Sequence, residues 1–402
     1  MNSEKARTCR KWPLCPPDSF LDEELRTLQD RHLYRKVRAI DRTGAVRGIL
    51  DGRSLCLFCG NDYLGLSFHP EVVGALIEGA RRYGAGAGAA RLTSGHASVH
   101  AALEARLAAV KNKENALVYS TGYLANLGIL TALAGPEDLV VMDKLCHASM
   151  VDAARLSGAA IRVYPHRLYR RCEEILKRSP GFRRKILVTE SVFSMDGDTA
   201  DIAELIRLKE KFGCLLVVDD AHGTGVLGRR GGGAAEDPAQ SEKIDVVMGT
   251  LSKALGCLGG YAAASSKMID YLTNFSRPFI FTTALPPALC AAALAAVDVL
   301  ERNPGLFESL WRHVRRMREG LTAAGLSYEP SESPIFPVMT GDEAEALRLS
   351  QTLLEAGFLV PAIRYPTVPK GKARLRLTVS AAHSDDDIDA FLAALRCSLK
   401  SI

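Results

Sequence analysis

The chain has 402 residues, more than one compact core usually holds, so we expect a large domain with a smaller one packed against it. Hydrophobic residues make up 47% and charged residues 24%, a balance that excludes disordered, collagen-like and coiled-coil chains. The net charge of +5 is spread along the sequence without a basic stripe, so we expect no nucleic-acid partner.

The sequence also argues against a membrane or secreted protein. No apolar run reaches the ~18 residues that a membrane helix needs. No secretory signal is recognisable, and residues 1–20 are interpreted as a flexible tail. The 10 cysteines show no spacing of a disulfide framework and are interpreted as free thiols. We therefore expect a cytoplasmic protein.

Two pairs of residues have the spacing of possible metal ligands. Cys56 and Cys59 lack a second pair or nearby ligand histidines, so both are interpreted as strand residues. His96 and His100 are four residues apart, but the glutamate of a zinc-protease helix is missing between them. We therefore expect no metal.

In chain order, a helix is predicted over 22–38, within an N-terminal helix and arm (21–60) that packs with the smaller domain. A second helix is predicted over 71–83. The glycine and alanine run that follows, 84–89, has the spacing of a dinucleotide fingerprint. That fingerprint needs a strand before it, however, and here a helix precedes it. A loop bordering the site is the remaining interpretation.

Residues 61–285 are assigned to the large domain. Short β-rich runs alternate there with helical stretches, which predicts an α/β doubly wound, mainly parallel sheet with helices on both faces. Most of the runs are continuously apolar, as in central parallel strands. The predicted strands are 116–119, 139–142, 185–189, 215–218, 246–249 and 261–264.

Residues 286–402 are assigned to the smaller α/β domain. The alanine-rich run 288–300 predicts a buried helix, and 374–379 predicts an extended segment. Ser384 precedes three aspartates, and a serine cap with an acidic first turn predicts the start of the last helix.

In a doubly wound sheet, ligands bind beyond the carboxyl ends of the strands. The polar residues after each predicted strand are therefore candidate site residues, and we expect them to converge around a small anionic aromatic ligand. These segments are 120–123, His147, 190–194, 219–222 and 250–253.

Lys253 is the only charged residue between Asp245 and Lys267, and it follows an apolar strand. Desolvation lowers the pKa of a lysine and permits Schiff-base chemistry near neutrality. Most lysines are solvated surface groups, but these surroundings favour a reactive amine.

Three more residues suit a bound ring. Asp219 ends an apolar strand, where a carboxylate needs a cationic partner such as a pyridinium nitrogen. A helix cap is the alternative, for which Asp220 is the better candidate. His147 and His222 each follow a strand, where an imidazole can stack on a ring or bond its hydroxyl.

A phosphate can bind at the next helix start. Gly122 and Tyr123 precede the helical stretch 124–133, so their backbone N–H groups can face an anion. Thr250 and Ser194 can add hydroxyl groups. The alternative is a glycine that serves the turn alone.

Arg374 and Arg376 alternate with leucines and so point to one face of a strand. Either can clamp a substrate carboxylate with two hydrogen bonds. Exposure on an edge strand is the alternative, and the spacing suits both.

The sequence resembles the α-oxoamine synthases from residue 61 to residue 383. The most specific motifs are 189–198 (TESVFSMDGD), 219–223 (DDAHG) and 249–254 (GTLSKA). The resemblance implies a fold-type I enzyme that depends on pyridoxal 5'-phosphate and acts as a homodimer with sites at the subunit interface.

The resemblance also implies individual roles. Lys253 attaches the cofactor, Asp219 pairs with the pyridine nitrogen, His222 contacts the ring hydroxyl and His147 stacks on the ring. The other implied cofactor-binding residues are Gly122, Tyr123, Ser194 and Thr250. The implied substrate-binding residues are Arg376, for the amino-acid carboxylate, together with Arg35, Asn61 and Thr367.

Segments 84–100 and 360–369 are typical of the members that condense L-alanine with a pimeloyl thioester, on coenzyme A or acyl carrier protein, in biotin biosynthesis. The alternatives are a related synthase that uses another acyl-CoA with glycine or serine, an aminotransferase, and a catalytically silent thioester-binding protein.

Overall fold

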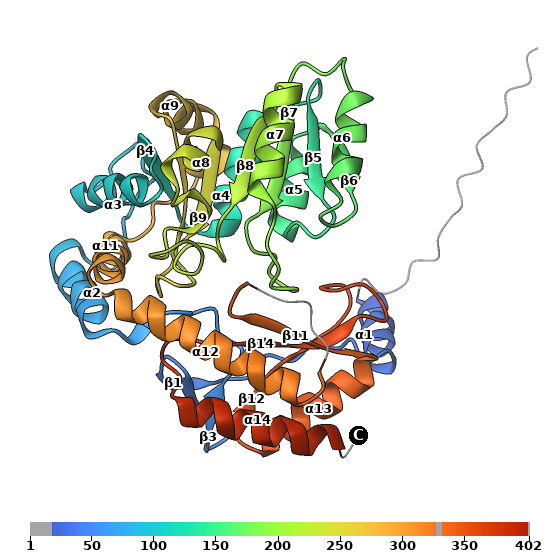
Figure 1. Cartoon of the computed structure of the whole chain (residues 1–402). Helices are drawn as coiled ribbons and strands as arrows, with labels where there is room; N and C mark the ends of the chain where they lie inside the picture. The colour runs from blue at the N-terminus through green and yellow to red at the C-terminus, as the bar shows by residue number, and fades with distance from the viewer. Residues whose placement is uncertain (1–17, 327–331, 401–402) are drawn as a thin grey trace, which may run out of the picture.

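The computed structural model describes residues 18–326 and 332–400, so most of the predicted tail lies outside the described residues. A large lobe is built on a seven-stranded sheet, and a smaller lobe contains a four-stranded and a three-stranded sheet (Figure 1). Across the described ranges, no helix has the length and apolar character that crossing a membrane requires.

The large sheet has the strand order β4-β10-β9-β8-β7-β5-β6. Its six predicted strands are confirmed to within one residue at each end, whereas β6 was not predicted. The strands are β4 (Asn115–Tyr119), β5 (Leu139–Asp143), β6 (Ala160–Tyr164), β7 (Lys185–Glu190), β8 (Leu215–Asp219), β9 (Val246–Thr250) and β10 (Gly260–Ala264).

Strand β10 departs from the parallel pattern, because it is antiparallel to both β9 and β4. Strands β6, β5, β7, β8 and β9 are parallel to their neighbours in this group. The connection from β9 to β10, residues 251–259, is shorter than the crossover of about a dozen residues that a parallel pair needs. It therefore returns the chain as a hairpin, and Lys253 lies in it.

Helices cover both faces of the large sheet. Val217 of β8 packs on the face that α4 (Gly122–Leu133) and α5 (Ala148–Leu156) cover. Its neighbours Leu216 and Val218 pack on the opposite face, with α6 (Tyr169–Lys177) and α7 (Ile202–Phe212). Because strand side chains alternate between faces, Asp219 follows Val217 and projects toward α4 and α5.

The smaller lobe joins segments far apart in sequence. One sheet has the order β1-β2-β3-β12, and the other has the order β11-β14-β13. The strands are β1 (Asp41–Gly44), β2 (Arg47–Leu50), β3 (Arg53–Leu57), β11 (Ile335–Gly341), β12 (Phe358–Leu359), β13 (Ala362–Ile363) and β14 (Ala373–Thr378). Cys56 lies in β3 as predicted, whereas Cys59 lies beyond its end, so the strand prediction is wrong for Cys59.

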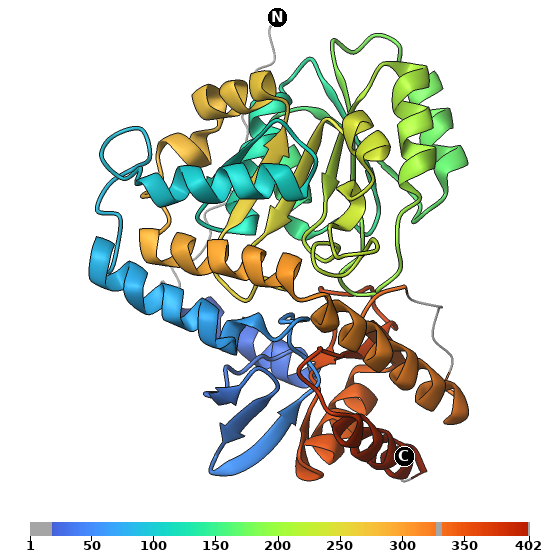
Figure 2. The ribbon, with the colours of Figure 1, turned by 60° about the vertical axis from the view of Figure 1, so that its left-hand side comes forward.

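Helix α2 (Pro70–Tyr83) lies beside α11 (Pro287–Arg302), which is also the predicted buried helix (Figure 2). Because α11 also packs on α3 (Ser98–Val110), the domain boundary at residue 285 stays a prediction. The remaining helices are α8 (Pro238–Lys243), α9 (Ser266–Phe275), α10 (Arg277–Ile280), α12 (Pro304–Ala323), α13 (Glu343–Glu355) and α14 (Asp385–Lys400), with 3-10 helices η1 (Leu66–Phe68) and η2 (Gly233–Ala235).

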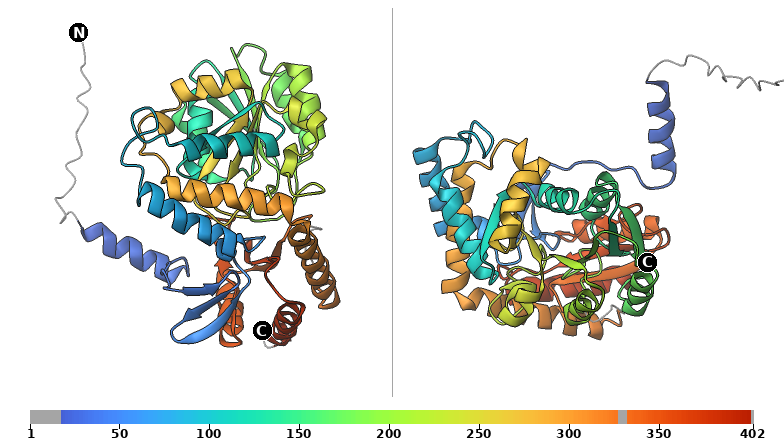
Figure 3. Two further views of the ribbon diagram at one scale, coloured as in Figure 1. Left: turned by 90° about the vertical axis from the view of Figure 1, so that its left-hand side faces the viewer. Right: turned by 90° about the horizontal axis from the view of Figure 1, so that it is seen from above.

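The two chain ends compare differently with prediction. Helix α1 (Ser19–Asp30) ends well before residue 38, since His32 takes a left-handed φ of 55° and the chain then continues without helix. Helix α1 has no buried residue and stands apart from the body (Figure 3). At the other end, the Ser384 cap is confirmed, because Ser384 Oγ accepts from the Asp387 N–H and Asp387 Oδ2 accepts from the Ser384 N–H.

Candidate active site

Lys253 lies in the bend after β9 and is partly buried. Burial lowers the pKa of its amine to about 8, while the nearby carboxyl groups of Asp219 and Glu190 oppose that shift. A larger share of this amine is therefore neutral near pH 7 than of a surface lysine. The interpretation of Lys253 as a solvated surface group does not fit its burial.

Asp219 is buried at the end of β8 and has an N–H donor on each oxygen. Asn126 of α4 donates from Nδ2 to Oδ2 at 2.7 Å, and the backbone N–H of Ala221 donates to Oδ1 at 2.9 Å. Asn126 Nδ2 also donates to Ser149 Oγ at 2.9 Å. Asn126 was not among the predicted site residues, although an amide within the apolar stretch 124–133 indicates a buried polar contact.

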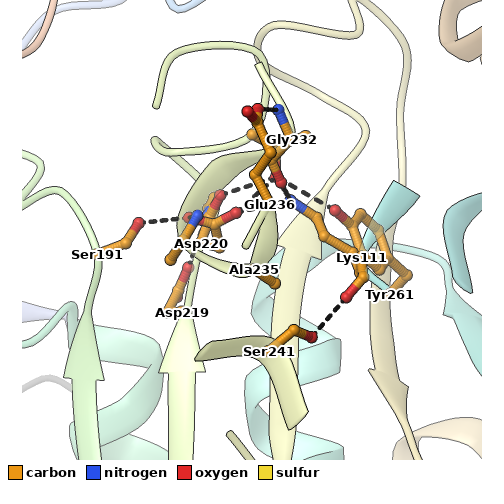
Figure 4. A network of polar contacts seen from close by, with 12 residues as sticks. Lys111, Ser191, Asp219, Asp220, Gly232, Ala235, Glu236, Ser241 and Tyr261 are labelled. Carbon is orange, nitrogen blue, oxygen red and sulfur yellow. Dashed lines mark hydrogen bonds and ion pairs between the residues drawn. The ribbon is translucent and has the colours of Figure 1, made fainter. Parts of the chain in front are cut away.

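The helix-cap interpretation of Asp220 is wrong. Asp220 points to the opposite face of the sheet from Asp219, where its Oδ2 lies 2.6 Å from Lys111 Nζ and its Oδ1 accepts from Ser191 Oγ at 2.6 Å (Figure 4). The chain after Asp220 forms turns rather than a helix, so there is no first turn to cap.

His222 and Arg376 are joined by a residue that the sequence analysis did not single out, Tyr63. The Tyr63 hydroxyl lies 2.7 Å from His222 Nδ1, and Arg376 Nη2 donates to the same hydroxyl at 3.3 Å. Burial lowers the pKa of His222 well below its usual range, and the charges of Lys253 and Arg376 add to this. The imidazole of His222 is therefore neutral.

Arg376 lies in the central strand of its sheet, so the edge-strand alternative is wrong. It is buried, and it donates from Nε to the Ser194 carbonyl at 2.6 Å and from Nη1 to Asn61 Oδ1 at 3.2 Å. Arg374 is also buried but pairs with Asp196 at 2.7 Å. Of the two arginines, Arg376 hydrogen-bonds to the candidate residues Ser194 and Asn61, whereas Arg374 lines the cavity beside His147.

His147 caps α5 and lies at the wall of a cavity of about 950 Å³ that Ser194 and Thr367 also line. Its Nδ1 lies 2.8 Å from Ser149 Oγ. Surrounding protein atoms exclude water from part of the ring and lower the pKa of His147. The side chain of Arg35 is exposed and donates to the Tyr365 carbonyl at 3.0 Å, so it holds the loop that carries Thr367.

Gly122 is the first residue of α4, where a side chain would be in tight contact with β9. A Cβ there would lie 3.1 Å from Met248 Cε and 3.3 Å from Thr250 Oγ1. The helix start is thus pressed against the end of β9, beside Asp219 on β8. Tyr123 follows at the first turn, with its own side chain exposed and its hydroxyl bonded to Asp152.

In residues 18–326 and 332–400, no group of three or more His, Cys, Asp and Glu residues is arranged to hold a metal ion. His96 and His100, the two histidines with the spacing of metal ligands, each contact another protein group. His96 Nδ1 accepts from Arg91 Nε at 3.0 Å, and His100 Nε2 lies 2.8 Å from the Leu285 carbonyl.

The residues present fit pyridoxal 5'-phosphate. Lys253 would supply an amine for its aldehyde, Asp219 a carboxylate for its ring nitrogen, and the start of α4 N–H groups for its phosphate. Two buried oxygens, Asn126 Oδ1 and Glu190 Oε1, have no hydrogen-bond partner among the described residues. Such polar atoms are typical of a site that binds a polar group.

Comparisons with known proteins identify the family of the chain. The family model described as aminotransferase class I and II matches residues 53–395. An 8-amino-7-oxononanoate synthase from Geotalea daltonii is 48% identical over 378 residues, which cover 93% of this chain and 96% of the relative. A serine palmitoyltransferase structure from Sphingomonas wittichii matches with a TM-score of 0.90 at 32% identity, over 96% of this chain and 99% of its own. A serine palmitoyltransferase solved with pyridoxal 5'-phosphate matches with a TM-score of 0.89 at 30% identity, over 96% and 98%.

Proposed function

We propose that this chain, which belongs to the aminotransferase class I and II family, makes 8-amino-7-oxononanoate in biotin biosynthesis. It is a fold-type I enzyme that depends on pyridoxal 5'-phosphate. The substrates are L-alanine and a pimeloyl thioester of coenzyme A or acyl carrier protein, and carbon dioxide and the free thiol leave. The observation that carries this proposal is the meeting of Lys253, Asp219 and His222 at one sheet edge in a chain so similar to the Geotalea daltonii relative.

When bound, the cofactor draws negative charge from the α-carbon of the amino acid into its ring. Asp219 faces the ring nitrogen in this proposal, and the N–H donors of Asn126 and Ala221 keep its carboxylate oriented. Neutral His222 offers a hydrogen bond to the ring hydroxyl, since its Nδ1 is engaged with Tyr63. His147, at the start of α5, would stack on one face of the ring.

Lys253 has two tasks in this proposal. Its Nζ would hold the cofactor and, when released from it by the amino acid, would accept the proton of the α-carbon. A pKa of about 8 places a useful fraction of neutral amine at physiological pH, so the base is available without a partner that deprotonates it.

Arg376 binds the carboxylate of alanine. Its guanidinium is held at three points, by Ser194, Asn61 and Tyr63, so the orientation of the fork is set before the substrate arrives. Holding both substrates in one orientation supplies about 7–11 kcal/mol of the barrier in favourable cases. The cavity beside His147, with apolar walls at Phe193, Met339 and Val368, receives the acyl chain.

The same proposal includes a homodimer in the cytoplasm. Helix α1 has no buried residue, and α2 exposes Val73, Leu76 and Ile77, which leaves apolar surface for a second copy. The cysteines in the described part of the chain are free thiols, as in a reducing compartment.

The test follows free thiol release from a series of acyl-CoA substrates with alanine, serine and glycine. We expect release that needs both substrates and is fastest with pimeloyl-CoA and alanine. Faster turnover of palmitoyl-CoA with serine, or of acetyl-CoA with glycine, would indicate a related synthase with another substrate pair. Conversion of the cofactor to its amine form by an amino acid alone would indicate an aminotransferase.

A further inference from the structure

Glu190, a residue without a role in the mechanism above, lies beside Asp219. The two residues end neighbouring parallel strands in direct register, β7 and β8, and the N–H of Ser191 donates to the Asp219 carbonyl at 2.8 Å. Residues in register on parallel strands project to the same face. Both carboxyl groups therefore face α4 and α5, and both are almost fully buried, at 2% and 5% exposed.

The hydrogen-bond partners of the two carboxyl groups differ. Asp219 has a nitrogen donor on each oxygen. Glu190 has Oε1 without a partner among the described residues. The backbone N–H groups of His147 and Ser194 act on the Glu190 carboxyl group and lower its pKa. Both residues line the cavity at the candidate cofactor site.

Two buried carboxyl groups side by side rarely both ionise, because each charge raises the cost of the other. Both Asp219 oxygens accept a hydrogen bond, as a carboxylate requires, whereas Glu190 Oε1 accepts none among the described residues. We propose that Glu190 carries a proton at neutral pH and is a positioning residue, joining the His147 and Ser194 loops while leaving Asp219 as the single negative charge at the ring nitrogen.

The electrostatic environment supports this assignment. Burial raises the pKa of Glu190 well above its usual range, and the charge of Asp219 raises it further, against the opposing effects of Lys253 and the backbone N–H groups. A second carboxylate here would favour the protonated form of Lys253, since Glu190 is one of the two acids that raise the pKa of that amine. A neutral Glu190 thus also keeps Lys253 available as a base.

The experiment compares wild type with Glu190→Gln, which imitates a neutral carboxyl group, and Glu190→Leu, which removes the polar contacts. We expect the infrared carbonyl band of a neutral carboxyl group in the wild-type holoenzyme at neutral pH, and its loss in Glu190→Gln. Asp138→Asn is the matched control, because Asp138 is a buried acid held ionised between Arg183 and Arg184, and it should leave the band intact.

Cofactor binding tests the positioning role. Glu190→Gln should keep the cofactor dissociation constant within about threefold of the wild-type value. Glu190→Leu should raise it by about tenfold or more, because the groups that orient the binding residues are lost. The pH dependence of the cofactor absorbance should be the same in Glu190→Gln and wild type. A wild-type spectrum without that band, or an absorbance titration displaced by about one pH unit in Glu190→Gln, would overturn the proposal.

The inference rests on the proposed cofactor roles of Asp219 and His147. Its infrared and binding readouts need no alanine or acyl thioester, so they are separate from the substrate test. If pimeloyl-CoA proves not to be a substrate, the infrared carbonyl band and the cofactor dissociation constants still test the assignment of Glu190.

Discussion

Lys111 Nζ and Asp220 Oδ2 form an ion pair of 2.6 Å in which neither side chain is exposed to solvent (Figure 4). Lys111 also donates to Thr224 Oγ1 at 2.8 Å and to the Gly232 carbonyl at 2.7 Å. The pair therefore ties α3 and its following turn to the loop after β8. Because Asp220 is next to Asp219, the pair fixes the loop on the face opposite the candidate site.

Replacing Lys111 with methionine should lower the free energy of unfolding by about 3–5 kcal/mol, since Asp220 would be left as a buried charge without its partner. Urea unfolding followed by circular dichroism measures the change. Lys267→Met, at an exposed lysine, should change stability by about 0.5 kcal/mol or less. A loss below about 1 kcal/mol for Lys111→Met would mean that the loop is held by its other contacts.

Lys253→Ala should abolish attachment of the cofactor by borohydride reduction and lower kcat by at least about a thousandfold, because both the attachment point and the base are removed. Mass spectrometry of the reduced protein locates the attachment. Lys267→Ala, fourteen residues further along the chain and exposed, is the control and should retain both attachment and activity. Cofactor attached at another lysine in wild type would refute the assignment.

Arg376→Gln and Arg374→Gln form a matched pair on β14, since both arginines are buried on the same face. Arg376→Gln should raise the KM for alanine by about tenfold or more, as loss of a charged carboxylate contact costs about 1.5–3 kcal/mol. Arg374→Gln breaks the pair with Asp196 and should affect stability more than the KM for alanine. Equal KM effects would indicate that the substrate carboxylate is bound elsewhere.

The sequence predicted the large sheet well because its strands are continuous apolar runs, a pattern that survives without tertiary information. It missed β6, where Arg162 interrupts the run and the outer position exposes part of the strand. Strand β10 is antiparallel to β9 because only residues 251–259 connect the two strands. The length of this connection is enough to predict a hairpin from the sequence.

Only the site residues that directly follow a predicted strand could be predicted from the sequence. The rule for doubly wound sheets directs attention to Asp219 and His222, but the partners of these residues come from elsewhere in the chain. Tyr63 reaches His222 across 159 positions, and Asn126 reaches Asp219 across 93 positions. Successive side chains of a strand face opposite sides of the sheet, so the pattern of β8 also predicts that Asp219 and Asp220 point to opposite faces.

His166 bridges two buried acids and should make stability depend on pH. Its Nδ1 lies 2.9 Å from Asp143 Oδ1 and its Nε2 lies 2.7 Å from Asp198 Oδ2. Burial alone would lower the pKa of His166, but the hydrogen bonds to these two acids outweigh it and raise the pKa to about 9. Arg167 also pairs with Asp198, and the Phe193 ring lies nearly perpendicular to the His166 ring.

The sign follows from the raised pKa. The folded state holds the proton more tightly than the unfolded state, so the stabilisation is fully present below about 6.5 and is lost as the pH rises through about 9. His166→Asn removes that dependence. Urea unfolding of both proteins across this range should therefore show a stability difference that shrinks as pH rises, and a difference that stays constant would mean that His166 is neutral in the folded protein.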